Sequence, residues 1–105
     1  MKPRYYDKDG SPITDVLAWA EKFEDRGYKR VAHTTLPDGK QVSTVWLGLD
    51  HGWGTGPPLI FETMVFPPDS WVECDGVRYS TLAGAEAGHV AMVEKWTKKE
   101  VSHEA

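Results

Sequence analysis

The chain has 105 residues, of which 40% are hydrophobic, 27% charged and 11% aromatic. This length fits one domain, and this composition is typical of folded rather than disordered proteins. The balance of 12 basic against 16 acidic residues gives a formal net charge of -4. That charge argues against general nucleic-acid binding, which depends on neutralising phosphates. We therefore expect a single domain over residues 1–105 that does not bind nucleic acid.

Cysteine content and hydropathy predict the compartment. The single cysteine, Cys74, cannot form an internal disulfide, which fits a reducing environment. No stretch approaches the roughly 20 apolar residues of a membrane-spanning helix. The first residues also lack the apolar core of a signal peptide. The sequence thus predicts a soluble protein of the cytoplasm with no membrane partner.

The N-terminal part of the sequence predicts an extended segment, a turn and a helix. Tyr5 and Tyr6 precede an Asp-Gly pair at residues 9–10, which favours a turn. Thr14 then predicts a helix N-cap, and Gly27 predicts the end of that helix. The apolar residues between them recur at helical spacing and form one stripe, namely Val16, Trp19, Ala20 and Phe23.

A hairpin follows the helix. Two strands, at residues 28–36 and 41–49, flank an Asp-Gly pair at 38–39, and that dipeptide favours a two-residue hairpin loop. With these two residues as the loop, His33 lies opposite Thr44. One face of the hairpin then carries polar and aromatic side chains, namely His33, Thr35, Thr44 and Trp46.

The next segments predict a loop and a central strand. Residues 50–58 are rich in glycine and proline, and the run at 59–66 is apolar on both alternating faces. A strand with two apolar faces is typical of the middle of a sheet. Residues 71–79 contain a further Asp-Gly pair and predict either a second tight hairpin or one irregular strand. The structure of residues 67–76 stays open.

A helix completes the expected fold. It begins at a cap at Ser80 or Thr81 and runs to about Lys99, with a frayed tail from about residue 100. Gly84 and Gly88 weaken this helix unless they allow a close approach to the sheet. Its stripe consists of Leu82, Ala85, His89, Met92, Val93 and Trp96. We expect an α+β fold in which a three- to five-stranded antiparallel sheet lies between an N-terminal and a C-terminal amphipathic helix.

The glycine-rich loop is the first candidate site. Its alternate glycines expose backbone N–H groups, as phosphate-binding loops do, but the lysine and hydroxyl residue that end such loops are missing. A structural or oligomer-contact loop is the alternative reading. Within this loop we select Asp50, His51 and Trp53 as candidate ligand-binding residues.

The polar face of the hairpin is the second candidate site. Glu62 joins His33, Thr44 and Trp46 if the even-numbered residues of both strands share one side. A carboxylate beside an imidazole suits acid–base chemistry, and an indole suits the stacking of a flat ligand. In the alternative reading, His33 and Thr44 are an exposed cross-strand pair, and Lys29 or Arg30 neutralises Glu62.

Other chemistry finds little support in the sequence. Asp50 and His51, with His33 or Glu62, are the only candidate metal ligands, and they lack a recognised spacing, so we expect neither a metal nor a cofactor. No nucleophile motif surrounds the serines or Cys74. We interpret His89 as a partly buried, hydrogen-bonded helix residue. Trp53 and Trp71 have no periodic reason to be buried and are candidates for ligand or partner contact.

The sequence resembles a family of small uncharacterised proteins of bacteriophages and of bacterial genomes with phage remnants. The resemblance rests on the block VSTVWLGLDHGWG at residues 42–54 and on GPPLIFETMVF at residues 56–66. It extends to the Tyr-Tyr-Asp opening, to residues 78–81 and to the Ala-Gly-His at 87–89, whereas residues 67–76 match least. It implies a phage accessory protein that acts in the host cytoplasm, and it implies no particular activity.

These observations lead to three alternative functions. The first is a non-enzymatic, homo-oligomeric binding module that captures a small ligand or a host factor and counters a host defence. A nucleotide-like ligand would need cations, for which Lys29, Arg30, Lys40 and Arg78 are available. The second is a small hydrolase that uses His33 or His51 with Glu62. The third is an inhibitor that binds a host enzyme purely by protein–protein contact.

Overall fold

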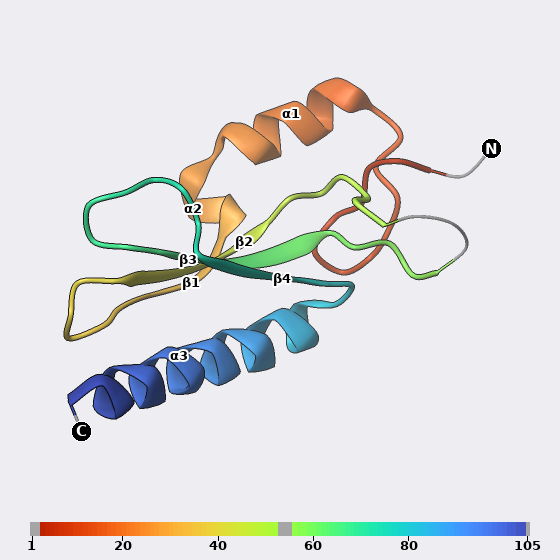
Figure 1. Cartoon of the computed structure of the whole chain (residues 1–105). Helices are drawn as coiled ribbons and strands as arrows, with labels where there is room; N and C mark the ends of the chain where they lie inside the picture. Colours follow the sequence, from red (N-terminus) through yellow and green to blue (C-terminus); the bar gives the residue numbers. More distant parts are fainter. Residues whose placement is uncertain (1–2, 53–55, 105) are drawn as a thin grey trace.

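The computed structural model of the chain describes residues 3–52 and 56–104. It contains four strands, β1 (Arg30–Thr35), β2 (Gln41–Trp46), β3 (Phe61–Phe66) and β4 (Asp75–Tyr79). They form one sheet in the order β1-β2-β3-β4, with every neighbouring pair antiparallel. Two helices, α1 (Val16–Glu24) and α2 (Arg26–Lys29), precede the sheet, and α3 (Leu82–Glu104) follows it (Figure 1). The expected α+β class with an antiparallel sheet is therefore confirmed.

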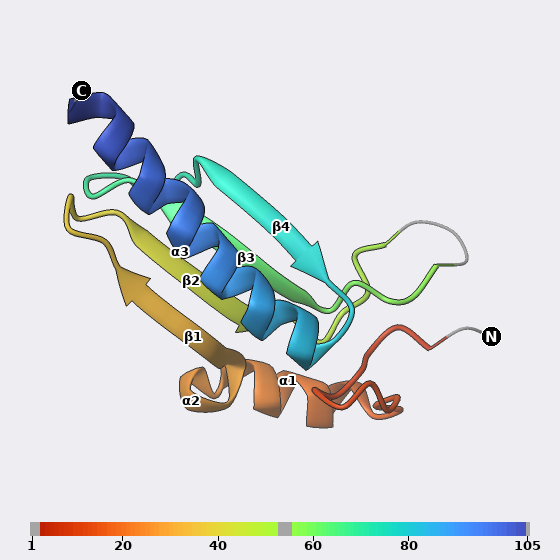
Figure 2. The same cartoon turned by 90° about the horizontal axis from the view of Figure 1, so that it is seen from below.

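The long helix α3 lies across one face of the sheet and contacts all four strands (Figures 1 and 2). Thr81 is its N-cap, because the Thr81 hydroxyl accepts a hydrogen bond from the Gly84 N–H at 3.0 Å. The helix continues to Glu104 and does not end near Lys99 as predicted. It buries the stripe residues Ala85, His89 and Met92 against the sheet, whereas Leu82 at the start of the stripe stays 37% exposed.

Gly88 brings α3 close to the sheet. A Cβ atom at this position would lie 2.2 Å from Cζ of Tyr79, so only glycine leaves room for that ring. Tyr79 is the last residue of β4 and packs against the buried cluster around Trp46 and Phe61. The close approach therefore offsets the weakness that glycine brings to a helix.

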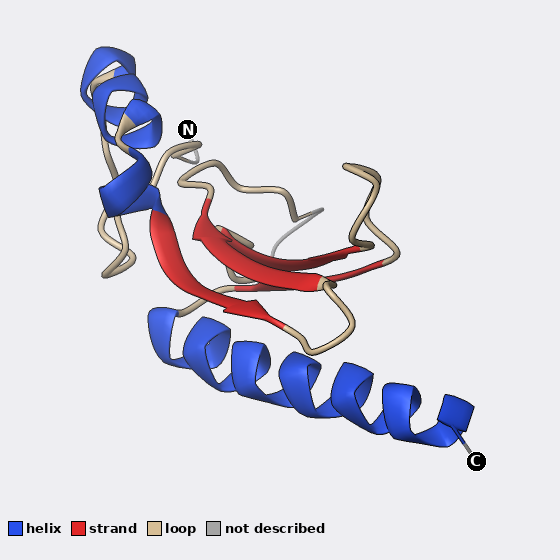
Figure 3. Ribbon diagram, turned by 90° about the vertical axis from the view of Figure 1, so that its left-hand side faces the viewer, coloured by secondary structure: helices blue, strands red, loops and turns tan. Residues whose placement is uncertain are grey.

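The N-terminal helix differs from the prediction in its ends and in its position. Asp15, not Thr14, is the N-cap, and α1 ends at Glu24 because Asp25 begins α2 by accepting the Gly27 N–H. Figures 2 and 3 show α1 and α2 beside the β1 edge of the sheet. The sheet is thus not enclosed between two helices, since only α3 covers a face.

Trp19 attaches α1 to the end of β2. Its indole Nε1 donates a hydrogen bond to the Leu47 carbonyl at 3.1 Å. The indole passes over Gly48, which has a φ of +68°, and a Cβ there would lie 2.4 Å from the ring of Trp46. The rings of Trp19 and Trp46 therefore both lie against Gly48, where no side chain separates them. This packing connects the N-terminal segment to the core.

The β1–β2 hairpin has a three-residue loop where two residues were predicted. Leu36 donates its N–H to the Lys40 carbonyl at 2.8 Å, and Gly39 donates to the Leu36 carbonyl at 2.9 Å. Gly39 has a φ of +93°, the conformation that glycine adopts most easily. As a result His33 pairs with Ser43, not with Thr44. Because side chains alternate along a strand, this one-residue shift exchanges the two faces of β2 relative to β1.

The third Asp-Gly pair, at residues 75–76, forms no turn. Asp75 and Gly76 begin β4 and pair with Val65 and Met64 of β3. Of the two alternatives predicted for residues 71–79, the hairpin does not form, and the single strand is confirmed for residues 75–79 only. Among the described residues, no helix is both long enough and apolar enough to cross a membrane.

Candidate functional site: the open face of the sheet

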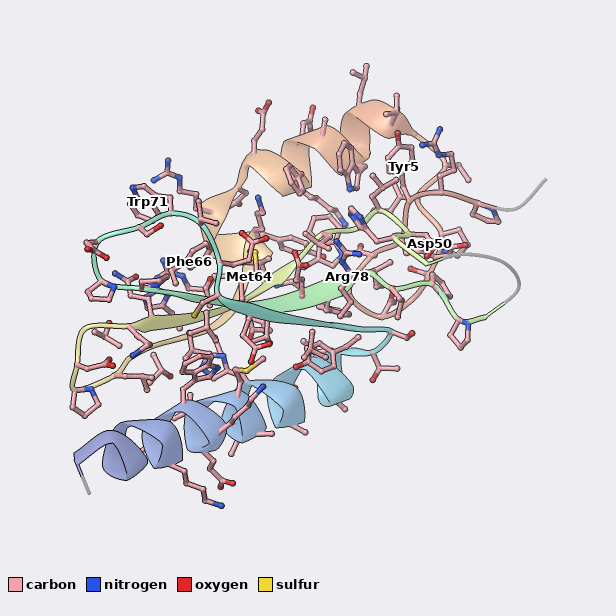
Figure 4. The ribbon with its side chains drawn as sticks, viewed as in Figure 1. Tyr5, Asp50, Met64, Phe66, Trp71 and Arg78 are labelled. Atoms are coloured by element: carbon pink, nitrogen blue, oxygen red, sulfur yellow. The ribbon has the colours of Figure 1, made fainter. Side chains whose placement is uncertain are left out.

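The candidate site is the face of the sheet that α3 leaves uncovered. The pairs Val45–Glu62 and Ser43–Met64 place these side chains on the side opposite the buried residues Thr44 and Thr63. Figure 4 shows Met64 and Phe66 on this side, away from α3. We call this surface the open face and define it by the residues His33, Ser43, Val45, Glu62, Met64, Phe66, Gly76 and Arg78.

Glu62 on the open face is held by Arg78 on the neighbouring strand. The two residues are direct cross-strand partners, and Arg78 Nε lies 3.1 Å from Glu62 Oε2. The exposed fractions of the side chains are 45% for Arg78 and 18% for Glu62. The partner of this carboxylate is thus not the predicted Lys29 or Arg30.

The polar cluster predicted on the hairpin does not assemble. Thr44 and Trp46 are fully buried beneath α3, on the face opposite His33. The Trp46 ring packs edge-on against Tyr28, and its Nε1 donates to the Tyr6 carbonyl at 3.0 Å, so it cannot stack on a ligand. The prediction that Thr44 and Trp46 share a surface with His33 is therefore wrong.

His33 and Glu62 do share the open face, but they lie apart. His33 is on β1 and Glu62 is on β3, with β2 between them. Two strand spacings separate their backbones by about 10 Å. His33 is also level with Met64, two residues farther along β3 than Glu62. The two side chains therefore share a surface without forming an acid–base pair.

Asp50 and His51 lie next to Arg78 at one end of the open face. Asp50 Oδ1 accepts hydrogen bonds from the N–H groups of Gly52 at 2.7 Å and Leu59 at 3.0 Å, so this carboxylate joins the two ends of the loop. A hollow of about 340 Å³ is lined by Asp50, His51, Gly52 and Arg78. The structure thus brings together two of the predicted loop residues and Arg78. Trp53 lies outside the described residues.

A second hollow, of about 590 Å³, lies along β4 on the other side of Arg78. Its charged lining consists of Glu62, Glu73, Asp75 and Arg78, so carboxylates outnumber cations. Two of the other cations proposed for binding a nucleotide, Lys29 and Lys40, do not line either hollow. Lys40 is paired with Asp38, and Lys29 Nζ lies 3.7 Å from the centroid of the Phe23 ring. The charge of this hollow disfavours a phosphate group.

The most exposed aromatic side chain among the described residues is Trp71, in the connection between β3 and β4. Its exposed fraction is 86%, and that of the neighbouring Val72 is 73%. The Trp71 ring meets Phe66 edge-on, with 6.2 Å between ring centroids (Figure 4). Trp71 therefore extends the apolar part of the open face into solvent, as expected for a residue without a periodic reason to be buried.

A polar network that the sequence reading missed lies on the opposite face, beneath α3. His89 is 6% exposed, and its two ring nitrogens lie 2.8 Å from Thr34 Oγ1 and 2.7 Å from Thr44 Oγ1. Thr44 Oγ1 in turn lies 2.5 Å from Thr63 Oγ1. Burial, and to a smaller extent the charge of His33, lowers the pKa of His89 below its ordinary value. The interpretation of His89 as a buried, hydrogen-bonded residue is confirmed, whereas its partners depend on a strand register that the sequence left open.

Among residues 3–52 and 56–104, no group of three or more histidine, cysteine, aspartate or glutamate side chains is arranged to hold a metal ion. Compared with known proteins, the chain matches no family model, no curated protein and no solved structure.

Proposed function

We propose that this chain is a non-enzymatic binding module that uses its open face to bind another protein. The observation that carries the proposal is the exposed Trp71 beside Phe66. Tryptophan is enriched among the residues that dominate binding energy, because it buries a large apolar area with few rotatable bonds. Phe66 and Met64 continue the apolar surface across the sheet, and the Glu62–Arg78 pair at its margin provides polar contacts.

The context of the proposed binding is the cytoplasm of a bacterial host. The resemblance to phage proteins in residues 42–66 supports a partner among host proteins, such as a component of a defence system. The uncovered sheet face supports a homo-oligomer as the active form. The arrangement of His33 and Glu62 supports binding over hydrolysis, because the carboxylate contacts Arg78 in place of a histidine.

The test compares capture of host proteins by three forms of the full chain. The immobilised wild type, Trp71→Ala and Leu17→Ala are each exposed to a lysate of a bacterial host. Leu17 is 70% exposed on α1 and is the matched control for loss of an exposed apolar side chain. We expect a protein that the wild type and Leu17→Ala retain and that Trp71→Ala loses. The purified partner should then bind Trp71→Ala at least about tenfold more weakly. Equal retention by all three forms contradicts the proposal.

A small anionic ligand is the second candidate. It is favoured by the 340 Å³ hollow, where Arg78 and His51 lie together. A thermal-shift screen with nucleotides, inorganic phosphate and divalent cations tests it, because a ligand at 100 times its Kd adds about 2.7 kcal/mol of stability. A rise in melting temperature that Arg78→Met removes would favour this candidate over the protein partner.

A further inference from the structure

A second surface, separate from the open face, lies along the outer edge of β4. This strand pairs only with β3 among the strands of the described chain and ends the sheet on this side. The outer side of an edge strand carries backbone N–H and C=O groups available to a further strand. Val77 at the middle of β4 is 44% exposed. The edge is therefore accessible to another chain.

An apolar groove follows this edge on the α3 side. It has a volume of about 270 Å³ and is lined by Val77 and Tyr79 from β4 and by Gly88, Ala91, Met92 and Lys95 from α3. Figure 2 shows β4 running beside α3 at the outside of the sheet. The helix contributes small residues, Gly88 and Ala91, where it faces the strand. Gly88 lets the Tyr79 ring approach the helix, and the short side chain of Ala91 does not fill the groove.

The groove is neutral as well as apolar. Lys95 is the only charged residue in its lining, and Lys95 Nζ lies 2.6 Å from Asp75 Oδ2 at the start of β4. Trp96 Nε1 also donates to this oxygen, at 3.0 Å. An occupant with a charged group in the groove would lose its hydration without gaining an unpaired counter-charge. The groove therefore favours an uncharged apolar side chain.

We propose that the β4 edge and this groove accept an extended segment of another protein as a fifth strand. The edge offers a row of main-chain donors and acceptors, which only another polypeptide backbone matches in spacing. Side chains of an added strand alternate between the two faces of the sheet, so every second one lies on the groove side, with Val77 and Tyr79. The expected segment is thus extended, with uncharged apolar residues at alternate positions. Arg78 faces the other way, so this surface is distinct from the open face.

A display library of random peptides of about ten residues, selected on the full-length protein, tests the proposal. We expect the enriched peptides to share alternating apolar residues and to slow the hydrogen exchange of the β4 backbone amides. Ala91→Arg fills the groove from an exposed helix position and should weaken peptide binding at least about tenfold. Val90→Arg is the matched control, because Val90 is 58% exposed and does not line the groove. It should stay within about twofold of the wild type.

Ala91→Met is a second, uncharged blocking variant that keeps the proposal testable should the arginine disturb folding. Absence of enriched peptides, or equal binding by Ala91→Met and the wild type, overturns the proposal. A dimer at micromolar concentration with slowed exchange in β4 also overturns it, in favour of a second copy as the occupant. Trp71→Ala should bind the peptides normally, so failure of the open-face proposal and failure of this one are distinguishable.

Discussion

His89 on α3 and Thr44 on β2 are joined by a hydrogen bond of 2.7 Å between His89 Nδ1 and Thr44 Oγ1, in the buried interior. A neutral imidazole has one donor and one acceptor nitrogen, so Thr34, His89, Thr44 and Thr63 form a chain with one consistent direction of donation. Protonation would make both ring nitrogens donors, and the two threonine hydroxyls could still accept from them, because a hydroxyl both donates and accepts. Burial of the ring, not loss of a hydrogen-bond partner, therefore disfavours the charged form of His89 and lowers its pKa.

The first prediction concerns pH. Burial lowers the pKa of His89 in the folded state, so the unfolded chain takes up the proton at a higher pH than the folded one. The stability contributed by neutral His89 is present above the unfolded pKa of about 6.5 and is lost as the pH falls below it. Urea unfolding at pH 7.5 and 5 should show this loss in the wild type and a smaller loss in His89→Gln. Equal pH dependence in both proteins would contradict the assignment.

The second prediction separates the two hydroxyl contacts of Thr44. Thr63→Val removes only the last hydroxyl of the hydrogen-bonded series, and should lower the free energy of unfolding by about 1 kcal/mol. Thr44→Val also leaves the buried Nδ1 of His89 without its partner, and should lower it by about 1–3 kcal/mol. Urea titrations of the two variants provide the comparison. A larger effect of Thr63→Val than of Thr44→Val would contradict the importance assigned to the contact between Thr44 and His89.

A third prediction follows from the contact between Gly88 and Tyr79. Alanine is favoured over glycine within helices by up to about 1 kcal/mol, so propensity alone predicts that Gly88→Ala stabilises α3. The added Cβ would instead meet the Tyr79 ring at 2.2 Å, and the variant should be destabilised. Gly84→Ala is the comparison, because its Cβ would lie 3.0 Å from Thr81 Oγ1 and 3.9 Å from Tyr79. Thermal melts should rank Gly88→Ala as the less stable of the two.

The fourth prediction concerns Glu62. Its ion pair with Arg78 is partly exposed, and such pairs contribute about 0–1 kcal/mol. Glu62→Gln should therefore fold with nearly unchanged stability and retain the Trp71-dependent partner. Loss of a measurable hydrolytic activity in this variant, with folding intact, would instead favour the hydrolase.

The fold class followed from the sequence because its signals are local. Hydrophobic periodicity marked the sheet region and the buried stripe of α3, and Thr81 was among the expected caps. The Asp-Gly pairs were less informative, because this dipeptide fits more than one conformation. At Gly39 it ends a three-residue loop, and at Gly76 it lies inside a strand, where pairing with β3 determines the conformation.

The composition of the site could not be predicted because it depends on register. The register of β2 against β3 determines whether Glu62 lies on the same face of the sheet as Thr44 or as Val45. The sequence of residues 47–60, which connects the two strands, does not determine that register. The shift at the β1–β2 loop added a second error by moving His33 away from Thr44. Trp71 was easier to identify, because no periodic pattern required it to be buried.

The position of α3 has a consequence for synthesis of the protein. Ala85, His89 and Met92 complete both buried clusters and the threonine network, yet they follow every strand in the chain. A nascent polypeptide that has emerged only as far as β4 exposes one entire side of its sheet to water. The interior can therefore close only after α3 has left the ribosome, and until then the apolar side of the sheet is prone to aggregation.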